Sequence, residues 1–223
     1  MSNDKQYNEF AEDFSESVSS PLISRNEFYK ILGKDISNKT LLDVACGDGV
    51  DLVYYQKLGV VVSGIDAAEG LVSIAKSKLP DADIRVGLFD NLPFDDNSFD
   101  VVVSKYAIQT SEDVQKALTE FTRVAKPGAM IVYLTVHPLR QFMEKKGKFR
   151  DYYKQEKIDS VLFNGDVVVQ EHSHTLSDYF NEQALENLKL ISVTEGSDFS
   201  DTSAQQVAGD YYPTFMICKL TKI

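Results

Sequence analysis

Two carboxylates and a glycine-rich turn are the residues whose types and spacing could do chemistry together. The turn Cys46-Gly47-Asp48-Gly49 follows an apolar run that contains Asp43, and Asp66 ends a second apolar run 23 residues after Asp43. Glycines let the backbone approach a ligand closely, and the N–H groups that open the next helix offer polar contacts. A carboxylate at the end of the second strand can accept both hydroxyls of a ribose. The pattern predicts a site for a ribose-bearing ligand; the alternative role for each carboxylate is a turn or a helix cap.

The glycine spacing argues against a nicotinamide dinucleotide as that ligand. The dinucleotide fingerprint needs three glycines in the pattern G-x-G-x-x-G. A frame that starts at Gly47 puts Leu52 at the third position, and a frame that starts at Ala45 puts Val50 there. Neither frame leaves a glycine-lined helix start for a pyrophosphate, so a dehydrogenase is disfavoured.

Short apolar runs alternate with helical patterns in the middle of the chain. The runs at residues 40–45, 60–66, 82–86, 99–104 and 129–136 predict strands, and residues 50–58, 68–78 and 111–124 predict the helices between them. Strands that are apolar throughout and alternate with helices are typical of a parallel sheet covered on both faces. Ligands of such sheets bind at the carboxyl ends of the strands, where the strand order reverses.

The two ends of the chain have a different pattern. Apolar residues at positions 7, 10, 11 and 14 and a segment at 26–32, closed by Gly33, predict two N-terminal helices. After Val136 we expect a strand at 167–170, a helix at 177–188 and closing strands at 190–194 and 214–220. The segment 138–157 carries seven Lys or Arg residues and three acids. It is interpreted as a segment that attracts an anionic substrate or covers the cleft as a lid, with a solvated helix as the alternative.

Composition and charge exclude several classes of protein. Lys plus Arg number 23 and Asp plus Glu number 34, so the net charge is −11, which disfavours a nucleic-acid partner. No run approaches the roughly 18–20 apolar residues of a membrane-spanning helix, and the first residues lack the apolar core of a signal peptide. Two cysteines, Cys46 and Cys218, are too few for a disulfide framework. We therefore expect a cytoplasmic protein with no membrane insertion; its oligomeric state is not predicted.

Four ordered sequence blocks carry a family resemblance. They are Leu41-Leu42-Asp43-Val44-Ala45-Cys46-Gly47-Asp48-Gly49, Gly64-Ile65-Asp66, Asn91-Leu92-Pro93-Phe94-Asp95-Asp96-Asn97-Ser98-Phe99-Asp100-Val101-Val102 and Arg123-Val124-Ala125-Lys126-Pro127-Gly128. In this order and spacing the chain resembles the class I S-adenosylmethionine (SAM)-dependent methyltransferases, in the small-molecule branch similar to the ubiquinone/menaquinone methyltransferases. The resemblance is strong over about residues 40–136. It implies an α/β, Rossmann-like fold: a seven-stranded, mostly parallel sheet with an antiparallel last strand and helices on both faces.

The resemblance also implies roles for individual residues. Asp43 would organise the glycine loop and the SAM amino group, and Asp66 would bind the ribose. The remaining implied cofactor residues are Ala45, Cys46, Gly47 and Gly49 under the methionine moiety, Ala67 beside the adenosine, Leu88 and Phe89 around the adenine, Ser104 after the fourth strand, and Tyr7 and Phe14 in an N-terminal cover.

Two positions depart from the family pattern. Ala45 replaces the first glycine of the loop, which adds only a methyl group and matters mainly if this residue needs a positive φ. Leu88 stands where an aspartate commonly takes the adenine amino group, so backbone and apolar contacts would have to hold the base.

The candidates for acceptor chemistry follow the fourth and fifth strands. His137 directly follows the fifth strand and is the candidate general base or substrate contact; a structural hydrogen bond is the alternative. Tyr106, after the fourth strand, is a candidate substrate contact. His172 and His174 lie two residues apart, on one face of a strand, but no cysteine or paired carboxylate completes a metal site. No metal is predicted.

The function implied is methyl transfer from SAM to an oxygen or nitrogen of a small-molecule acceptor, with S-adenosylhomocysteine (SAH) as the product. The protein would act mainly by proximity and orientation. One alternative is a non-catalytic SAM- or SAH-binding protein or partner subunit. Another is a protein or RNA methyltransferase that docks through 138–157. We expect a single domain over 1–223, divided into a helical cover at 1–39, the SAM-binding core at 40–136, a lid or substrate insertion at 137–175, and a closing helix and strands at 176–223.

Overall fold

A computed structural model describes residues 3–12, 15, 23–145, 151–162, 167–198 and 212–223 of the chain. The strands are β1 (Thr40–Val44), β2 (Val61–Asp66), β3 (Asp83–Val86), β4 (Phe99–Lys105), β5 (Ala125–Val136), β6 (Lys157–Leu162), β7 (Val167–His172), β8 (Leu188–Gly196) and β9 (Phe215–Lys222). The helices are α1 (Asn3–Glu9), α3 (Ile23–Leu32), α4 (Val50–Lys57), α5 (Glu69–Lys78), α6 (Val114–Val124), α7 (Pro138–Arg140) and α8 (Leu176–Phe180), with short helical turns η1 (Ile108–Thr110) and η2 (Gln141–Lys145).

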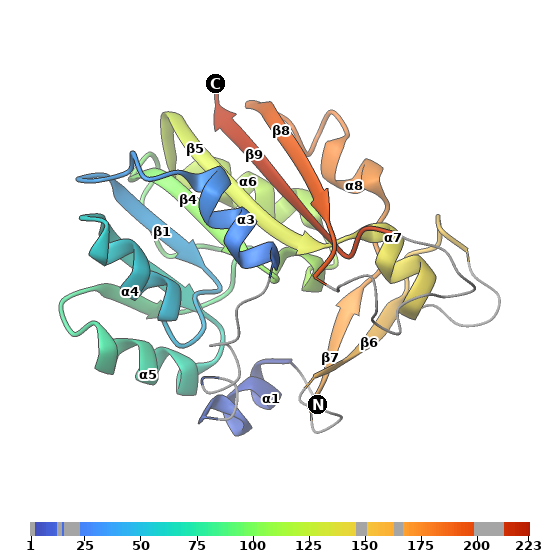
Figure 1. Cartoon of the computed structure of the whole chain (residues 1–223), viewed down its shortest axis with the longest axis horizontal. Helices are drawn as coiled ribbons and strands as arrows, with labels where there is room; N and C mark the ends of the chain where they lie inside the picture. Colours follow the sequence, from blue (N-terminus) through green and yellow to red (C-terminus); the bar gives the residue numbers. More distant parts are fainter. Residues whose placement is uncertain (1–2, 13–14, 16–22, 146–150, 163–166, 199–211) are drawn as a thin grey trace.

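Seven strands form one sheet in the order β3-β2-β1-β4-β5-β9-β8 (Figure 1). All neighbouring pairs from β3 to β5 are parallel, whereas β9 runs antiparallel to both β5 and β8. The predicted α/β fold, with a mostly parallel sheet and an antiparallel last strand, is confirmed. The strand order reverses between β1 and β4, so this is the edge at which a ligand site is expected.

Both faces of the sheet are covered by helices because both sets of alternating strand residues are apolar. Leu41, Val101 and Val103 point to one face, in a core with residues of α3, α4 and α5. Leu42 and Val102 point to the other face, in a core with residues of α6 and α8. The continuous apolar runs in the sequence are explained by this double burial.

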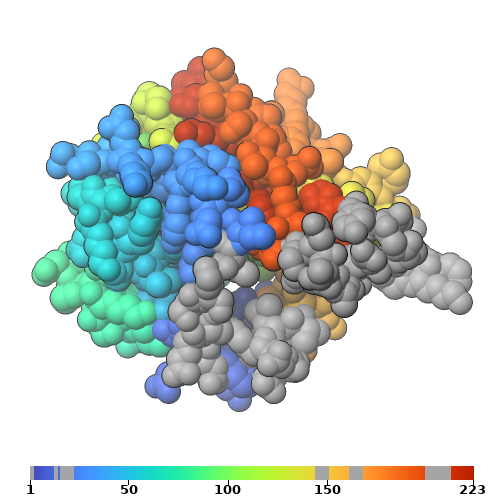
Figure 2. All heavy atoms as spheres, in the orientation of Figure 1, coloured from blue at the N-terminus to red at the C-terminus, as the bar shows by residue number. Residues whose placement is uncertain are grey.

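Helix α3 covers the middle of the sheet on the face seen in Figure 2. Its atoms lie between those of α4 and those of β8 in this view. The side chains of Phe28 and Leu32 are buried in the core beneath it, and the Lys219 Nζ of β9 donates to the carbonyl oxygen of Ile31 at 3.0 Å. Gly33 ends the helix with a φ of 79°, a conformation that glycine adopts without strain.

The N-terminal helix and a β-hairpin meet beside the carboxyl ends of the strands. Strands β6 and β7 form a separate antiparallel pair. The Asn3 side chain makes two hydrogen bonds with the backbone of Gln170 in β7, at 2.7 and 2.9 Å. The Asn8 Oδ1 accepts from the Gly70 N–H of α5 at 2.7 Å. Helix α1 therefore bridges α5 and β7, as Figure 1 shows.

The helix predicted over 177–188 was wrong in length, since α8 ends at Phe180. The next residue is the physical reason. The Asn181 Oδ1 accepts from the Ala184 N–H at 2.8 Å, so this side chain starts a separate turn rather than continuing the helix. Strand β6 was not predicted at all, because it falls in the range 137–175, which was interpreted as a lid or substrate insertion.

Candidate functional site

The glycine-rich turn takes up left-handed backbone at three alternate positions. Ala45, Gly47 and Gly49 have φ values of 62°, 55° and 77°. The Cys46 N–H donates to the carbonyl oxygen of Ile65 at 2.9 Å, which joins the turn to the end of β2. A Cβ at Gly49 would lie 2.9 Å from the Cβ of Ala75 in α5, so only glycine fits there. The turn is built by backbone conformation and close packing.

Asp66 holds the turn in place from the neighbouring strand. Its Oδ2 accepts from the Gly47 N–H and its Oδ1 accepts from the Ala68 N–H, both at 2.9 Å. Burial raises the pKa of Asp66, while these backbone N–H groups oppose the shift. Each carboxylate oxygen can accept a second hydrogen bond, so the side chain that organises the turn can also bind hydroxyl groups. Ala67 lies between these contacts and is half-buried.

Asp43 is a buried carboxylate with an unsatisfied oxygen. It is 1% exposed, and its Oδ2 has no hydrogen-bond partner among the residues that the structure describes. Burial raises the pKa of Asp43 to about 8, against the lowering effect of Lys105. An unpaired buried polar atom in a native protein calls for a functional explanation. A cationic ligand group beside the turn would supply the missing donor.

Backbone strain concentrates at this edge of the sheet. Five non-glycine residues have positive φ within the described chain, and three of them are asparagines, which tolerate this conformation. The other two are Ala45, after β1, and Tyr106, after β4, with φ values of 62° and 51°. Sparsely populated backbone conformations cluster at functional sites. The departure at Ala45 thus does fall on a position that needs a positive φ.

Tyr106 and Ser104 lie at the end of β4. The Tyr106 hydroxyl makes hydrogen bonds with Ser24 Oγ of α3 at 2.9 Å and with Asp198 Oδ2 at 2.7 Å, and burial raises its pKa. Asp198 Oδ1 also accepts from the Ser24 N–H at 2.7 Å, so the three residues tie α3 to the segment after β8. The buried Ser104 Oγ has no hydrogen-bond partner in the described part of the chain.

The residues predicted to surround or cover the adenosine lie in different environments. Leu88 is 59% exposed, whereas Phe89 packs against the core that contains α6. Tyr7 of α1 packs against the cluster of Ala68 and Leu71 at the start of α5. Burial raises the pKa of Tyr7, and the charges of Asp66 and Glu171 add to the shift. The predicted cover residue Phe14 lies outside the described residues.

A buried ionic network beside the turn was missed from the sequence. Asp51, in the first turn of α4, pairs with Lys105 of β4 and accepts from the Tyr29 hydroxyl of α3. Arg25 Nη2 of α3 lies 3.4 Å from the same carboxylate. Asp48, inside the turn, pairs with Lys78 and accepts from Ser15 Oγ at 2.6 Å. The available signal was the lysine that closely follows the apolar run Val101-Val102-Val103.

His137 has both ring nitrogens in hydrogen bonds within the protein. Its Nδ1 accepts from the Leu139 N–H at 3.0 Å, so it caps helix α7. Its Nε2, which must then carry the proton, donates to Glu195 Oε1 at 2.7 Å. Burial lowers the pKa of His137, despite the carboxylate. This geometry leaves neither nitrogen free to take a proton from a substrate.

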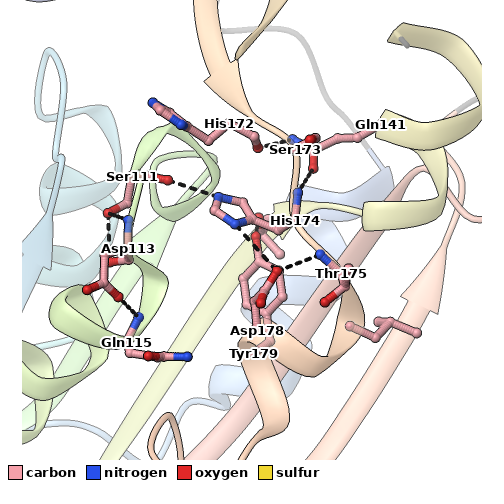
Figure 3. Close-up of polar contacts among 12 residues, drawn as sticks. Ser111, Asp113, Gln115, Gln141, His172, Ser173, His174, Thr175, Asp178 and Tyr179 are labelled. Carbon is pink, nitrogen blue, oxygen red and sulfur yellow. Dashed lines mark hydrogen bonds and ion pairs between the residues drawn. The ribbon is translucent and has the colours of Figure 1, made fainter. Parts of the chain in front are cut away.

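A second polar cluster, which includes a buried carboxylate that the sequence reasoning missed, lies at the carboxyl ends of β4 and β5 (Figure 3). The Gln141 Nε2 donates to Glu171 Oε2 at 3.0 Å, and its Oε1 accepts from the His174 N–H at 3.2 Å. Gln141, Glu171 and His174 are all buried. The His172 carbonyl also accepts from Gln141, at 3.1 Å. The Gln141 side chain thus joins the end of β7 to the helical segment that follows β5.

The ring of His174 lies between Ser111 and Asp178 in Figure 3. Its Nε2 donates to the Ser111 carbonyl oxygen at 2.9 Å, which leaves Nδ1 as the acceptor nitrogen of a neutral ring. That Nδ1 lies 3.9 Å from Asp178 Oδ2 and has no hydrogen-bond partner within the described structure. Burial lowers the pKa of His174. The Tyr179 hydroxyl and Thr135 Oγ1, 3.3 Å apart, extend the cluster beneath it.

The basic segment is not one helix in the structure. Arg140 lies in α7, η2 ends at Lys145, and Lys157 begins β6. Lys146, Lys148 and Arg150 lie outside the described residues. In the described ranges no group of three or more His, Cys, Asp or Glu side chains could hold a metal ion, and no helix is long and apolar enough to cross a membrane.

Comparison with known proteins shows which family carries this arrangement. A family model described as a methyltransferase domain matches residues 42–133, the segment from β1 to β5. Over these residues the chain is similar to a methyltransferase domain. The resemblance seen in the four sequence blocks is therefore confirmed, and SAM is the cofactor expected for this fold.

Two relatives of the matched segment have names that refer to quinones. The demethylmenaquinone methyltransferase of Renibacterium salmoninarum is 36% identical over 97 residues, which cover 44% of this chain and 41% of that protein. The ubiquinone/menaquinone biosynthesis C-methyltransferase of Campylobacter jejuni is 30% identical over 142 residues, covering 58% of this chain and 57% of that protein. The chain thus spans about half the length of these relatives.

The whole fold has solved counterparts. The S-adenosylmethionine-dependent methyltransferase of Mesorhizobium loti superposes with a TM-score of 0.70 at 21% identity, covering 88% of this chain and 96% of that chain. At this identity the likeness concerns the fold. The likeness extends beyond the methyltransferase domain, since the family model ends at residue 133.

The residues of the methyltransferase domain fit SAM. The unsatisfied Asp43 oxygen suits an ammonium group, and the free lone pairs of Asp66 suit ribose hydroxyls. Glycine at positions 47 and 49 keeps the turn free of side chains. Leu88 offers no hydrogen-bonding side chain to an adenine, as the sequence indicated.

Proposed function

We propose that this protein transfers a methyl group from SAM to an oxygen or nitrogen of a small-molecule acceptor. The observation that carries the proposal is the pairing of a strained glycine-rich turn with two carboxylates at the point of strand reversal. Asp43 has a buried oxygen without a donor, and Asp66 buttresses the turn while keeping lone pairs for a ligand. The family match over residues 42–133 supports it.

SAM supplies an electrophilic methyl group that leaves its sulfonium in an in-line displacement. The residues of the chain bind and orient. In this proposal Asp43 takes the amino group, Asp66 takes the ribose hydroxyls, and the turn from Ala45 to Gly49 lies under the methionine moiety. Because the displacement needs little further chemistry, holding SAM and the acceptor in line accounts for most of the rate enhancement.

The acceptor would lie toward α7, β7 and α8. Buried polar groups gather there, among them Gln141, Glu171 and His174. Buried hydrogen-bonding groups discriminate strongly between small molecules, because a wrong ligand leaves them unpaired. His137 and Tyr106 flank this region. Their existing hydrogen bonds favour a role in shaping it over a role in proton transfer.

Carbon is the alternative acceptor atom. One relative is named as a C-methyltransferase of quinone biosynthesis, and an activated aromatic carbon is a nucleophile that this fold could serve. We also propose a cytoplasmic location, which suits a small-molecule enzyme with two buried free cysteines.

The experiment that tests the proposal follows label from methyl-tritiated SAM. The protein is incubated with phenols, catechols, amines and a demethylated quinol, and separately with RNA and with a protein extract. Label in a small extractable product supports the proposal, and the product's structure distinguishes oxygen, nitrogen and carbon. Label only in RNA or protein would overturn the small-molecule assignment. SAM binding without label in any fraction would favour a non-catalytic SAM-binding protein.

A further inference from the structure

A buried lysine stands beside the glycine-rich turn. Lys105 ends β4, its side chain is 11% exposed, and it pairs with Asp51. Its Nζ lies 5.7 Å from the centre of the Phe28 ring and 5.3 Å from that of Tyr29. Burial lowers the pKa of Lys105, while Asp51 and Asp43 oppose the shift. Lysine is almost never buried unless it is paired, and its desolvation is costly.

Asp43 lies on the same face of the sheet as Lys105. In the β1–β4 register Asp43 is opposite Val103, and Lys105 is two residues farther along β4. Side chains two apart in a strand share a face. The charge of Lys105 lowers the pKa of Asp43, so the two groups interact.

The hydrogen bonds are unevenly shared between the two buried aspartates. Asp51 forms an ion pair with Lys105 and accepts hydrogen bonds from Arg25 and the Tyr29 hydroxyl. Asp43 Oδ2 receives no donor from the described residues. A network built for stability alone would be expected to satisfy both carboxylates. The site instead presents a carboxyl group with an open oxygen next to a buried cation.

An α-amino acid group has the complementary charges. Its ammonium would pair with Asp43, and its carboxylate would need a cation close by. Lys105 is the buried cation on that face, and its three N–H donors allow it to hold Asp51 and a second anion together. The methionine moiety of SAM is such a group, so the inference rests on the proposed function.

We propose that Lys105 binds the α-carboxylate of the SAM methionine moiety, with Asp51 and Arg25 positioning the lysine. The alternative is a lysine that only ties α3 and α4 to the sheet. The two roles differ in one respect that can be measured. A ligand-binding lysine affects only ligands that carry the carboxylate, whereas a structural lysine affects all ligands of the site.

The test compares three ligands by calorimetric titration: SAH, decarboxylated SAH, and 5′-methylthioadenosine, which lacks the whole amino acid group. In the wild-type protein, removal of the carboxylate from SAH should weaken binding at least about tenfold. In Lys105→Met, SAH should lose about the same factor, and binding of decarboxylated SAH and methylthioadenosine should stay within about twofold. Lys105→Arg should restore part of the SAH affinity. Lys76→Met, at an exposed lysine of α5, is the matched control.

Equal losses for all three ligands in Lys105→Met, or no loss for any, would overturn the proposal. If Lys105→Met does not fold, the wild-type comparison decides alone. SAH and decarboxylated SAH binding equally well would then refute carboxylate recognition. A wild-type protein that binds none of the three ligands would instead refute the proposed function, so the two failures are distinguishable.

Discussion

The two halves of the carboxyl edge of the sheet are built in different ways. On the cofactor side, the turn after β1 is shaped by backbone: three left-handed residues and two N–H bonds to Asp66. On the side proposed for the acceptor, the Gln141 side chain bonds Glu171 and His174 across 30 and 33 residues of sequence, and the His174 ring bonds Ser111 across 63. Side-chain bonding of this kind can change while the strands beneath it stay the same.

This difference indicates how one fold can keep its cofactor and change its acceptor. Backbone conformation at the turn depends on a few glycines and on packing against α5. The acceptor side depends on segments outside the family match at residues 42–133. If the account is correct, substitutions on the cofactor side alter SAM and SAH binding, and substitutions on the acceptor side leave that binding unchanged.

The largest effect is expected from Asp66→Ala. The variant loses the carboxylate that we propose binds the ribose, and with it the acceptor for the Gly47 and Ala68 N–H groups. We expect SAH affinity, measured by calorimetry, to fall about 100-fold, or about 2.7 kcal/mol, since each charge-assisted hydrogen bond contributes about 1.5–3 kcal/mol. Asp83→Ala, which removes an exposed carboxylate from β3, is the control and should bind normally. Unchanged affinity in Asp66→Ala would remove the ribose assignment.

The acceptor side is probed by Gln141→Leu. The change leaves the buried Glu171 carboxylate and the His174 N–H without their amide partner. The free energy of unfolding in urea should fall by about 2 kcal/mol, while SAH affinity should stay within about twofold. Gln183→Leu, at an exposed site, is the control. A large loss of SAH affinity in Gln141→Leu would mean that the two sides are not independent.

The affinity of the cofactor side for SAH should also depend on pH. Because burial raises the pKa of Asp43 to about 8, the side chain is mostly protonated below that pH, and it must lose its proton to pair with an ammonium. SAH affinity should therefore rise as the pH rises from 6 to 8, by at most about tenfold per unit. Asp43→Asn should bind more weakly and show a flat profile over this range. A flat wild-type profile would contradict the ammonium assignment.

The smallest effect is expected from Ala45→Gly. Left-handed backbone costs an alanine about 1–2 kcal/mol, and glycine loses about 0.5–1 kcal/mol more entropy on folding. Glycine at this position should therefore raise the free energy of unfolding by about 0.5–1 kcal/mol. Ala82→Gly, where φ is not positive, should lower it instead. Equal effects of the two changes would show that the turn is not strained at Ala45.

The same contrast explains what could be predicted from the sequence. The strands and the turn were predictable because their signals are local. These signals are the apolar runs, Gly47 and Gly49 in the turn, and Asp66 at 23 residues after Asp43. The seven-stranded, mostly parallel sheet with an antiparallel last strand came from the family resemblance and is confirmed. Strand β6 was missed because its alternation of apolar and polar residues is weak, and because it pairs with β7 outside the seven-stranded sheet.

The contacts of individual side chains were beyond the sequence. Nothing local indicates that Lys105 meets Asp51, or that Glu171 meets Gln141, since these pairs form only after distant elements pack together. The short α8 has a similar cause, because Asn181 favours a turn over the helix that its neighbours allow. His137 was singled out by its place after β5, and its partner Glu195 comes from β8.

The central claim is that the edge between β1 and β4 binds SAM. Calorimetric titration of the purified protein with SAM and with SAH tests it most directly. We predict one site per chain, with a dissociation constant in the micromolar range for either ligand. No binding of either ligand at millimolar concentration would contradict the account and would leave the methyltransferase domain as a fold without its cofactor.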